Sequence, residues 1–211
     1  YLDPEHGDRP QGARVAACRE WAAAEGIKAW DKVLLTSAGF EGLGKRQRPQ
    51  IVQAFRAMLG KPVSEARILF IPAAALDEEA KAMAQWCYDE LVRIGVDTGR
   101  IVSYGLDGRL SAGEALTYDA VYFTGGDTAH LLKRVRETGF DSVVKRMVYA
   151  GKVYVGVSAG SLIATPNIGD PYDEDRAGLC LVNAYLSVHC KPGTPPRADL
   201  PLPHLPLTDS Q

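Results

Sequence analysis

Long hydrophobic runs are absent from this sequence. No apolar stretch approaches the ~20 residues that a membrane-spanning helix needs, and residues 1–12 are polar and do not form a secretory signal. We therefore expect a cytoplasmic protein with no membrane partner. A surplus of one charge is also absent, since the formal net charge is −2. Small basic clusters such as residues 45–48 are typical of solvated faces, so we expect no nucleic-acid partner.

Cysteines are few and scattered, at positions Cys18, Cys87, Cys180 and Cys190. No Cys-x-x-Cys pair occurs, so nothing predicts a zinc site, and we expect no metal. The apolar surroundings of Cys87 and Cys180 indicate core thiols of a reducing compartment. Cys190 directly follows His189, but neighbouring residues of a strand point to opposite faces, which disfavours Cys190 as a nucleophile.

The glycine motifs that bind nucleotides are missing as well. Neither G-x-G-x-x-G nor G-x-x-x-x-G-K-[ST] occurs in the chain, and both motifs cradle phosphates with backbone N–H groups. We therefore expect no nucleotide and no other cofactor.

From residue 32 onward, short apolar runs alternate with amphipathic stretches. The expected strands cover residues 33–35, 67–71, 100–104, 120–123, 153–155 and 181–188, and the expected helices cover 50–59, 77–94, 111–116, 129–136 and 140–149. This alternation predicts an α/β fold with a doubly wound, mostly parallel sheet and helices on both faces.

The two ends of the chain differ from this pattern. Residues 1–31 form an N-terminal extension with a short alanine-rich helix expected at 15–25, ahead of a single domain at 32–211. Beyond Cys190, repeated prolines predict an extended surface segment and exclude a helix or a central strand. Because the chain starts at Tyr1 and stops in polar sequence, we expect a processed protein or a piece of a longer one, incomplete at its C-terminus.

The most informative stretch is residues 156–160, Gly-Val-Ser-Ala-Gly. It follows the expected strand at 153–155 and precedes residues that can begin a helix, so it has the form of a nucleophile elbow around Ser158. Such a turn exposes the hydroxyl beside the first free N–H groups of the helix, which can stabilise an oxyanion. The alternative is an ordinary Gly/Ser-rich turn between a strand and a helix.

Two other turns should lie at the same edge of the sheet, at residues 37–39 and 125–128. The second reads Gly-Gly-Asp-Thr and can aim backbone N–H groups outward. We expect the N–H groups of Gly126 and Ala159 to form an oxyanion hole. A tight loop or a phosphate cradle is the alternative for this turn.

A serine nucleophile needs a base. Of the four histidines in the chain, His189 ends the last expected strand, at the edge where Ser158 should lie. An acid that orients the base is also needed. The loop at 169–175 lies between Ser158 and His189 and offers four acidic residues, of which at most one need be catalytic. The alternative is a solvated acidic loop.

Taken together, these motifs resemble the peptidase E family of serine peptidases, which includes aspartyl dipeptidases and cyanophycinases. The resemblance covers roughly residues 32–190. It rests on five ordered segments, at residues 34–39, 70–74, 122–128, 156–161 and 178–189. It implies a flavodoxin-like fold related to class I glutamine amidotransferases.

The resemblance also implies roles for single residues. Ser158 would be the nucleophile, His189 the base, and Gly126 and Ala159 the oxyanion hole. The family's spacing after the nucleophile points to Asp173 as the acid.

Asp170 is the runner-up for the acid. The sequence also departs from the family pattern. Asp127 stands where the family usually has Asn, so a negative charge lies near the expected oxyanion. Residues 191–197 replace the family's Gly-His-x-Gly-Glu-Thr-Arg-like segment, so specificity for Asp-X dipeptides does not transfer.

The function expected from these motifs is that of a serine hydrolase, a peptidase E-like exopeptidase or dipeptidase that cleaves small peptides through a Ser-His-Asp triad. One alternative is an esterase or amidase that acts on another small acyl substrate. Another is a non-catalytic binding protein that retains the fold. The expected partner is a small peptide substrate, and a homodimer is left open.

Overall fold

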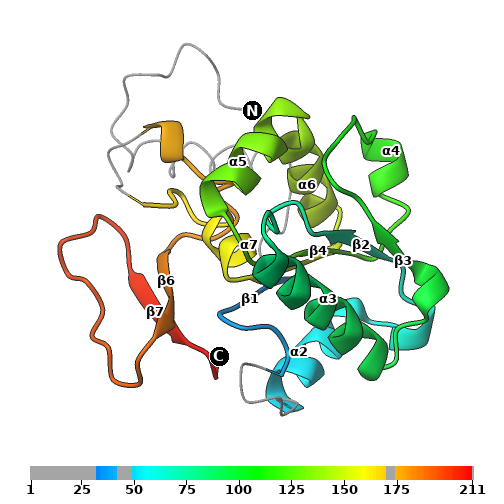
Figure 1. The fold of residues 1–211 in the computed structure, drawn as a ribbon, viewed down its shortest axis with the longest axis horizontal. Coiled ribbons are helices and arrows are strands. Elements are labelled where there is room, and N and C mark those ends of the chain that lie inside the picture. Colours follow the sequence, from blue (N-terminus) through cyan, green and yellow to red (C-terminus); the bar gives the residue numbers. More distant parts are fainter. Residues whose placement is uncertain (1–31, 42–48, 170–173, 211) are drawn as a thin grey trace.

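The computed structural model describes residues 32–41, 49–169 and 174–210, with a five-stranded parallel sheet at its centre (Figure 1). The strands are β1 (Val33–Thr36), β2 (Ile68–Ile71), β3 (Ile101–Ser103), β4 (Ala120–Phe123) and β5 (Val153–Val157). Their order across the sheet is β1-β5-β4-β2-β3, and every neighbouring pair is parallel. The expected N-terminal helix, Asp170 and Asp173 lie outside the described residues.

Helices cover both faces of this sheet. They are α2 (Pro49–Leu59), α3 (Glu78–Arg93), α4 (Ala112–Ala115), α5 (Thr128–Glu137), α6 (Phe140–Tyr149) and α7 (Ala159–Leu162), with short 3₁₀ turns at Val63–Glu65, Thr98–Arg100 and Glu174–Arg176. The sequence located the longer helices to within about two residues of these bounds, so the predicted α/β architecture is confirmed. None of the helices in the described residues is long and apolar enough to span a bilayer.

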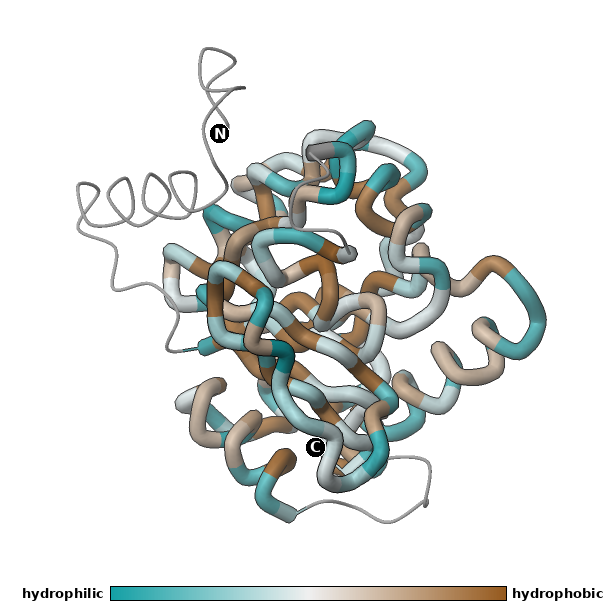
Figure 2. The backbone as a smooth tube through the Cα atoms, turned by 90° about the vertical axis from the view of Figure 1, so that its left-hand side faces the viewer, coloured by the Kyte–Doolittle hydropathy of each residue, from teal (hydrophilic) through white to brown (hydrophobic). Residues whose placement is uncertain are grey.

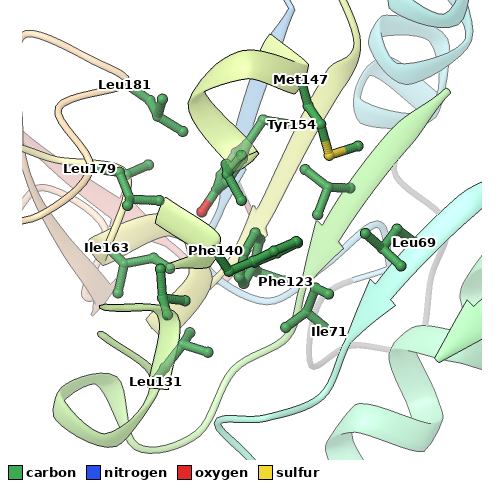
Figure 3. Close-up of a cluster of buried hydrophobic side chains, with 14 of the residues drawn as sticks. Leu69, Ile71, Phe123, Leu131, Phe140, Met147, Tyr154, Ile163, Leu179 and Leu181 are labelled. Carbon is green, nitrogen blue, oxygen red and sulfur yellow. The ribbon is translucent and has the colours of Figure 1, made fainter. Parts of the chain in front are cut away.

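The strands owe their continuous apolar sequences to burial on both sides. Side chains alternate along a strand, so β1, β2, β4 and β5 supply residues to two cores, whereas the edge strand β3 buries only Ile101. From β2, Leu69 and Ile71 pack in one core with α5 and α6, while Ile68 and Phe70 pack in the other with α2 and α3. Figure 3 shows the first core, and Figure 2 shows hydrophobic residues gathered in the interior along the sheet.

The strand order brings three turns together. β5 lies between β1 and β4, so the residues that follow these three strands meet at one edge of the sheet. These are the turn after Thr36, the turn after Phe123 and the turn at Ser158. Sites in open α/β sheets form at this carboxyl edge.

A second, two-stranded parallel sheet lies beside the first and consists of β6 (Tyr185–Cys190) and β7 (His204–Thr208) (Figure 1). The sequence predicted a strand at 181–188, so β6 begins and ends later than expected. The sequence predicted an extended surface segment after Cys190 but not that residues near its end form a strand, β7, which pairs with β6. Pro206 fits in β7 because this strand has only one partner in the described structure and Pro is tolerated at an edge.

Candidate active site

Ser158 occupies a strained turn between β5 and α7. Its φ is 47° and its ψ is −107°, a region that non-glycine residues rarely adopt. The turn is also very tight. A Cβ at Gly156 would lie 2.5 Å from the carbonyl oxygen of Gly160, and a Cβ at Gly160 would lie 2.6 Å from that of Phe123. Both glycines of the motif are therefore needed for the turn to form.

Ser161 ties this turn to β1. Its hydroxyl accepts a hydrogen bond from the N–H of Thr36 at 3.0 Å and lies 2.7 Å from the Thr36 carbonyl oxygen and 2.8 Å from that of Gly156. The N–H of Ser158 donates to the same Thr36 carbonyl at 3.0 Å. Ser161 is fully buried, so these bonds are shielded from water and hold the backbone of Ser158 in place.

His189 reaches Ser158 from a bulge in β6. The register between β6 and β7 shifts between Ser187 and Cys190, and His189 has a φ of 56°. Such a bulge re-aims a side chain. The imidazole Nε2 lies 2.9 Å from Ser158 Oγ, so the structure brings together the two residues that the sequence singled out as nucleophile and base.

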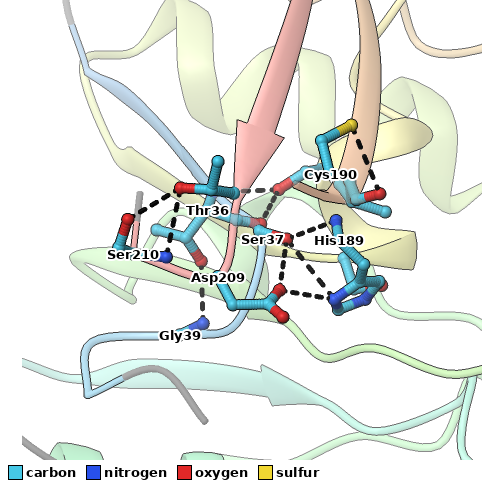
Figure 4. A network of polar contacts seen from close by, with 11 residues as sticks. Thr36, Ser37, Gly39, His189, Cys190, Asp209 and Ser210 are labelled. Atoms are coloured by element: carbon cyan, nitrogen blue, oxygen red, sulfur yellow. Dashed lines mark hydrogen bonds and ion pairs between the residues drawn. The ribbon is translucent and has the colours of Figure 1, made fainter. Parts of the chain in front are cut away.

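Asp209 is the acidic residue that contacts His189, and the sequence did not predict it. It directly follows β7, and its Oδ1 lies 2.6 Å from Nδ1 of His189 (Figure 4). With the ring proton on Nδ1 donated to this carboxylate, Nε2 is left as an acceptor for the hydroxyl of Ser158. The expected acids Asp173 and Asp170 lie outside the described residues.

The Gly-Gly turn after β4 adjoins the elbow. A Cβ at Gly125 would lie 3.2 Å from Cβ of Ser158, and a Cβ at Gly126 would lie 2.1 Å from the carbonyl oxygen of Ala74. In the described part of the chain, the N–H groups of Gly126 and Ala159 donate to no protein acceptor. Two backbone donors are therefore available at the edge that carries Ser158.

A model of peptidase family S51 matches residues 33–199. The chain belongs to this family. The match includes Ser158 and His189 and ends before Asp209. The resemblance read from the sequence motifs is thereby confirmed.

Curated relatives of this chain are uncharacterized peptidases. One from Listeria monocytogenes is 35% identical over 123 residues, which is 55% of this chain and 58% of that protein. Another, from Pasteurella multocida, is 29% identical over 137 residues, or 58% and 64% of the two chains. The chain thus spans less than two thirds of the length of these relatives.

Solved structures show the same architecture. A protein from Listeria monocytogenes EGD-e, provisionally assigned to peptidase E, superposes with a TM-score of 0.60 at 26% identity, over 77% of this chain and 80% of that one. A peptidase from an acI-B1 actinobacterium superposes with a TM-score of 0.53 at 17% identity, over 76% and 70%. The second likeness concerns the fold alone.

Asp127, which departs from the pattern of the family, caps a helix. Its carboxylate accepts a hydrogen bond from the N–H of His130 at 2.8 Å, at the start of α5. A carboxylate at this position also interacts favourably with the positive end of the helix dipole. This capping contact gives Asp127 a role in holding the first turn of α5, directly after the Gly-Gly pair.

A second serine–histidine pair lies nearby but is arranged differently. Nε2 of the buried His204 lies 2.8 Å from Oγ of Ser187, and Nδ1 accepts the N–H of Arg197 at 3.0 Å. The ring proton is therefore on Nε2, which donates to Ser187 and cannot remove its proton. Burial lowers the pKa of His204, and the charge of Arg197 acts in the same direction. This pair braces β6 against β7.

Other chemistry-bearing clusters are few in the described ranges. Across residues 32–41, 49–169 and 174–210, no group of three His, Cys, Asp or Glu side chains is arranged to hold a metal ion. Cys190 places its Sγ 3.8 Å from the Val188 carbonyl oxygen, within its own strand. Ser158, His189 and Asp209 are the site that the geometry singles out.

Proposed function

We propose that this S51 chain is a serine peptidase that cleaves small peptides, with Ser158 as nucleophile, His189 as base and Asp209 as the acid that orients the base. One observation carries the proposal. Ser158 Oγ lies 2.9 Å from His189 Nε2, and His189 Nδ1 lies 2.6 Å from Asp209 Oδ1. This continuous chain of hydrogen bonds is the arrangement that activates a serine hydroxyl.

The geometry supports a two-stage acyl transfer. Ser158 Oγ attacks the carbonyl carbon of the peptide while its proton passes to Nε2 of His189, and Asp209 stabilises the imidazolium that forms. The carbonyl oxygen becomes an oxyanion, for which the N–H groups of Gly126 and Ala159 are the proposed donors. His189 then gives the proton to the leaving amine. Water, deprotonated by the same imidazole, attacks the acyl group, and His189 returns that proton to Ser158 Oγ as the acid product leaves.

The assignment of the acid is supported by direct contact. The spacing of the family motifs favours Asp173, whereas the hydrogen bond to His189 Nδ1 is made by Asp209. A single Nδ1–H makes one strong hydrogen bond, so the two carboxylates compete for one role. We assign that role to Asp209 and give Asp173 no part in catalysis.

The proposed substrate is short. The turns after β1 and β4 lie at the same edge of the sheet as Ser158, and a site formed by converging turns suits dipeptides and other small peptides better than an extended chain. The same nucleophile could be acylated by an ester, because attack on a carbonyl does not by itself demand an amide. A substrate panel therefore decides between a peptidase and an esterase.

A fluorophosphonate probe tests the proposal without a known substrate. We expect wild-type protein to be labelled on Ser158, and Ser158→Ala to remove the labelling. Folded wild-type protein that stays unlabelled would exclude every serine hydrolase reading. A panel of dipeptides and matched small esters then ranks the substrates, with hydrolysis of esters alone counting against a peptidase.

A further inference from the structure

Ser37 lies behind the proposed base and acid and contacts both. It directly follows β1, and none of its surface is exposed. Its Oγ accepts the backbone N–H of His189 at 2.7 Å and lies 2.9 Å from Oδ1 of Asp209. Nδ1 of His189 is farther from this oxygen, at 3.4 Å (Figure 4).

The protons in this cluster can be assigned from the donors available. An ionised Asp209 has only acceptors, so the single hydroxyl proton of Ser37 is donated to Asp209 Oδ1. The Ser37 oxygen in turn accepts the N–H of His189. Oδ1 of Asp209 thus receives two donors, the hydroxyl of Ser37 and the Nδ1–H of His189. Ser37 Oγ and His189 Nδ1 are 3.4 Å apart, the longest of the three distances among Ser37, His189 and Asp209.

The loop that carries Ser37 is itself fixed to the body of the protein. The buried carboxylate of Glu90, from α3, accepts the N–H groups of Phe40 at 3.0 Å and Glu41 at 2.8 Å. Arg93, one turn further along α3, pairs with Glu41 through two hydrogen bonds of 2.8 and 3.0 Å. Ser37 is therefore a fixed point relative to the five-stranded sheet.

His189 and Asp209, by contrast, lie on or directly after the strands of the separate two-stranded sheet. We infer that Ser37 is a positioning residue of the proposed active site, which holds the bulged backbone of His189 and the carboxylate of Asp209 so that Nε2 meets Ser158. This inference rests on the proposed function. The described hydrogen bonds of the Ser37 side chain go to His189 and Asp209 and not to Ser158, so Ser37 acts through the base and the acid.

Removal of the Ser37 hydroxyl should have two effects. His189 loses the acceptor of its backbone N–H, so the ring is held less well against Ser158. Asp209 loses a donor and presents more negative charge to the imidazole, which favours the protonated ring. A hydrogen bond to a charged group is worth enough for about a 10- to 100-fold loss of rate. The acidic limb of the pH–rate profile should move to higher pH.

The test compares Ser37→Ala with Ser187→Ala, a matched serine-to-alanine change on β6 whose hydroxyl contacts His204 and not His189. The rate of fluorophosphonate labelling is measured against pH. We expect Ser37→Ala to be labelled about 10- to 100-fold more slowly, with the acidic limb displaced upward. Ser187→Ala, which weakens the contact between β6 and β7 but leaves the donors to Asp209 in place, should keep the acidic limb at the wild-type pH. Folded Ser37→Ala with the wild-type rate and profile would overturn the inference.

Two further measurements keep the test decisive. If Ser37→Ala does not fold, the near-isosteric Ser37→Cys, a weak donor, should show the same displaced limb, and a wild-type profile in that variant would overturn the inference. Proton NMR follows the downfield Nδ1–H resonance of His189, assigned by its loss in His189→Gln, and needs no activity. Loss of this signal in Ser37→Ala supports the inference. An unlabelled wild type would defeat the proposed function alone, and an unchanged signal would defeat the role of Ser37.

Discussion

The imidazole Nδ1 of His189 lies 2.6 Å from Oδ1 of Asp209, and this contact joins the bulge of β6 to the residue directly after β7. The register of the two parallel strands shifts from Ser187 opposite Pro206 to Cys190 opposite Thr208, and the bulged residue His189 turns its side chain to Asp209, which directly follows Thr208. The β6–β7 sheet therefore delivers both the proposed base and the proposed acid to the elbow at the edge of the five-stranded sheet.

Replacing the carboxylate of Asp209 should remove most of the activity. In Asp209→Asn, the side-chain amide would donate its N–H to Nδ1 of His189 and force the ring proton onto Nε2. Nε2 could then no longer accept the proton of Ser158. We expect a rate of fluorophosphonate labelling lower by about 10³- to 10⁴-fold, since the wrong tautomer has a cost of this order in serine proteases. Asp173→Asn is the matched comparison and should stay near wild type. The opposite ranking of the two variants would return the acid's role to Asp173.

The sequence was most informative where local pattern decides structure. The short apolar runs predicted all five strands of the main sheet, most clearly β2, β4 and β5, whose burial on both faces requires continuous hydrophobic residues. The tight elbow requires Gly156 and Gly160, so its sequence predicted the strained turn at Ser158. His189 was placed correctly at the end of a strand, and the family of the chain was predicted from the ordered motifs.

Asp209 could not be found in this way. Asp209 follows β7, and the prolines at 192–206 make the sequence of β7 look like that of a loop, because proline has no N–H to donate. β7 pairs with β6 across the loop at 191–203, and no local sequence pattern predicts this pairing. The bulge at His189 also arises from the register between β6 and β7, so the identity of the residue does not predict it. One signal was present, an acid immediately after a short alternation of apolar and polar residues at 204–208.

The Gly-Gly turn should tolerate no side chain at its second position. Gly126 has a φ of 132°, and a Cβ there would lie 2.1 Å from the carbonyl oxygen of Ala74. Gly126→Ala should therefore lower both the melting temperature and the rate of labelling. Gly139→Ala is the control, because Gly139 also has a positive φ, of 69°, but nothing lies within 4 Å of its Cβ. It should cost only the ~1–2 kcal/mol of the left-handed backbone and leave labelling intact. Equal effects of the two variants would exclude the close approach to Ala74 as the cause.

Removal of the Ser161 hydroxyl should loosen the elbow. Ser161→Ala leaves the buried N–H of Thr36 without the acceptor it has at 3.0 Å, which costs about 1–3 kcal/mol of unfolding free energy. We expect a lower urea midpoint together with slower labelling of Ser158. Thr165→Val removes another buried hydroxyl, one that bonds the carbonyls of Leu162 and Asn167, and should lower stability with little effect on the labelling rate per folded molecule. If both variants slow labelling equally, the hydrogen bonds of Ser161 do not specifically stabilise the turn at Ser158.

The carboxylate of Glu90 should make stability depend on pH. Burial raises the pKa of Glu90, although the N–H groups of Phe40 and Glu41 act in the opposite direction. A raised pKa means that the folded state binds the proton more tightly than the unfolded state. The stability linked to this proton is complete below the unfolded value of 4.5, and it is lost as the pH rises through the folded pKa.

Glu90→Gln tests this dependence because it cannot ionise. The free energy of unfolding, measured with urea from pH 4 to pH 8, should fall with pH in the wild type relative to Glu90→Gln. The difference should become constant above the raised pKa of Glu90. Glu79→Gln, at an exposed position on the same helix, controls for the loss of a charge on α3 and should show no such slope. A difference between wild type and Glu90→Gln that rises with pH would mean that the two N–H donors and Arg93 outweigh burial, and that Glu90 is held as a stabilised anion.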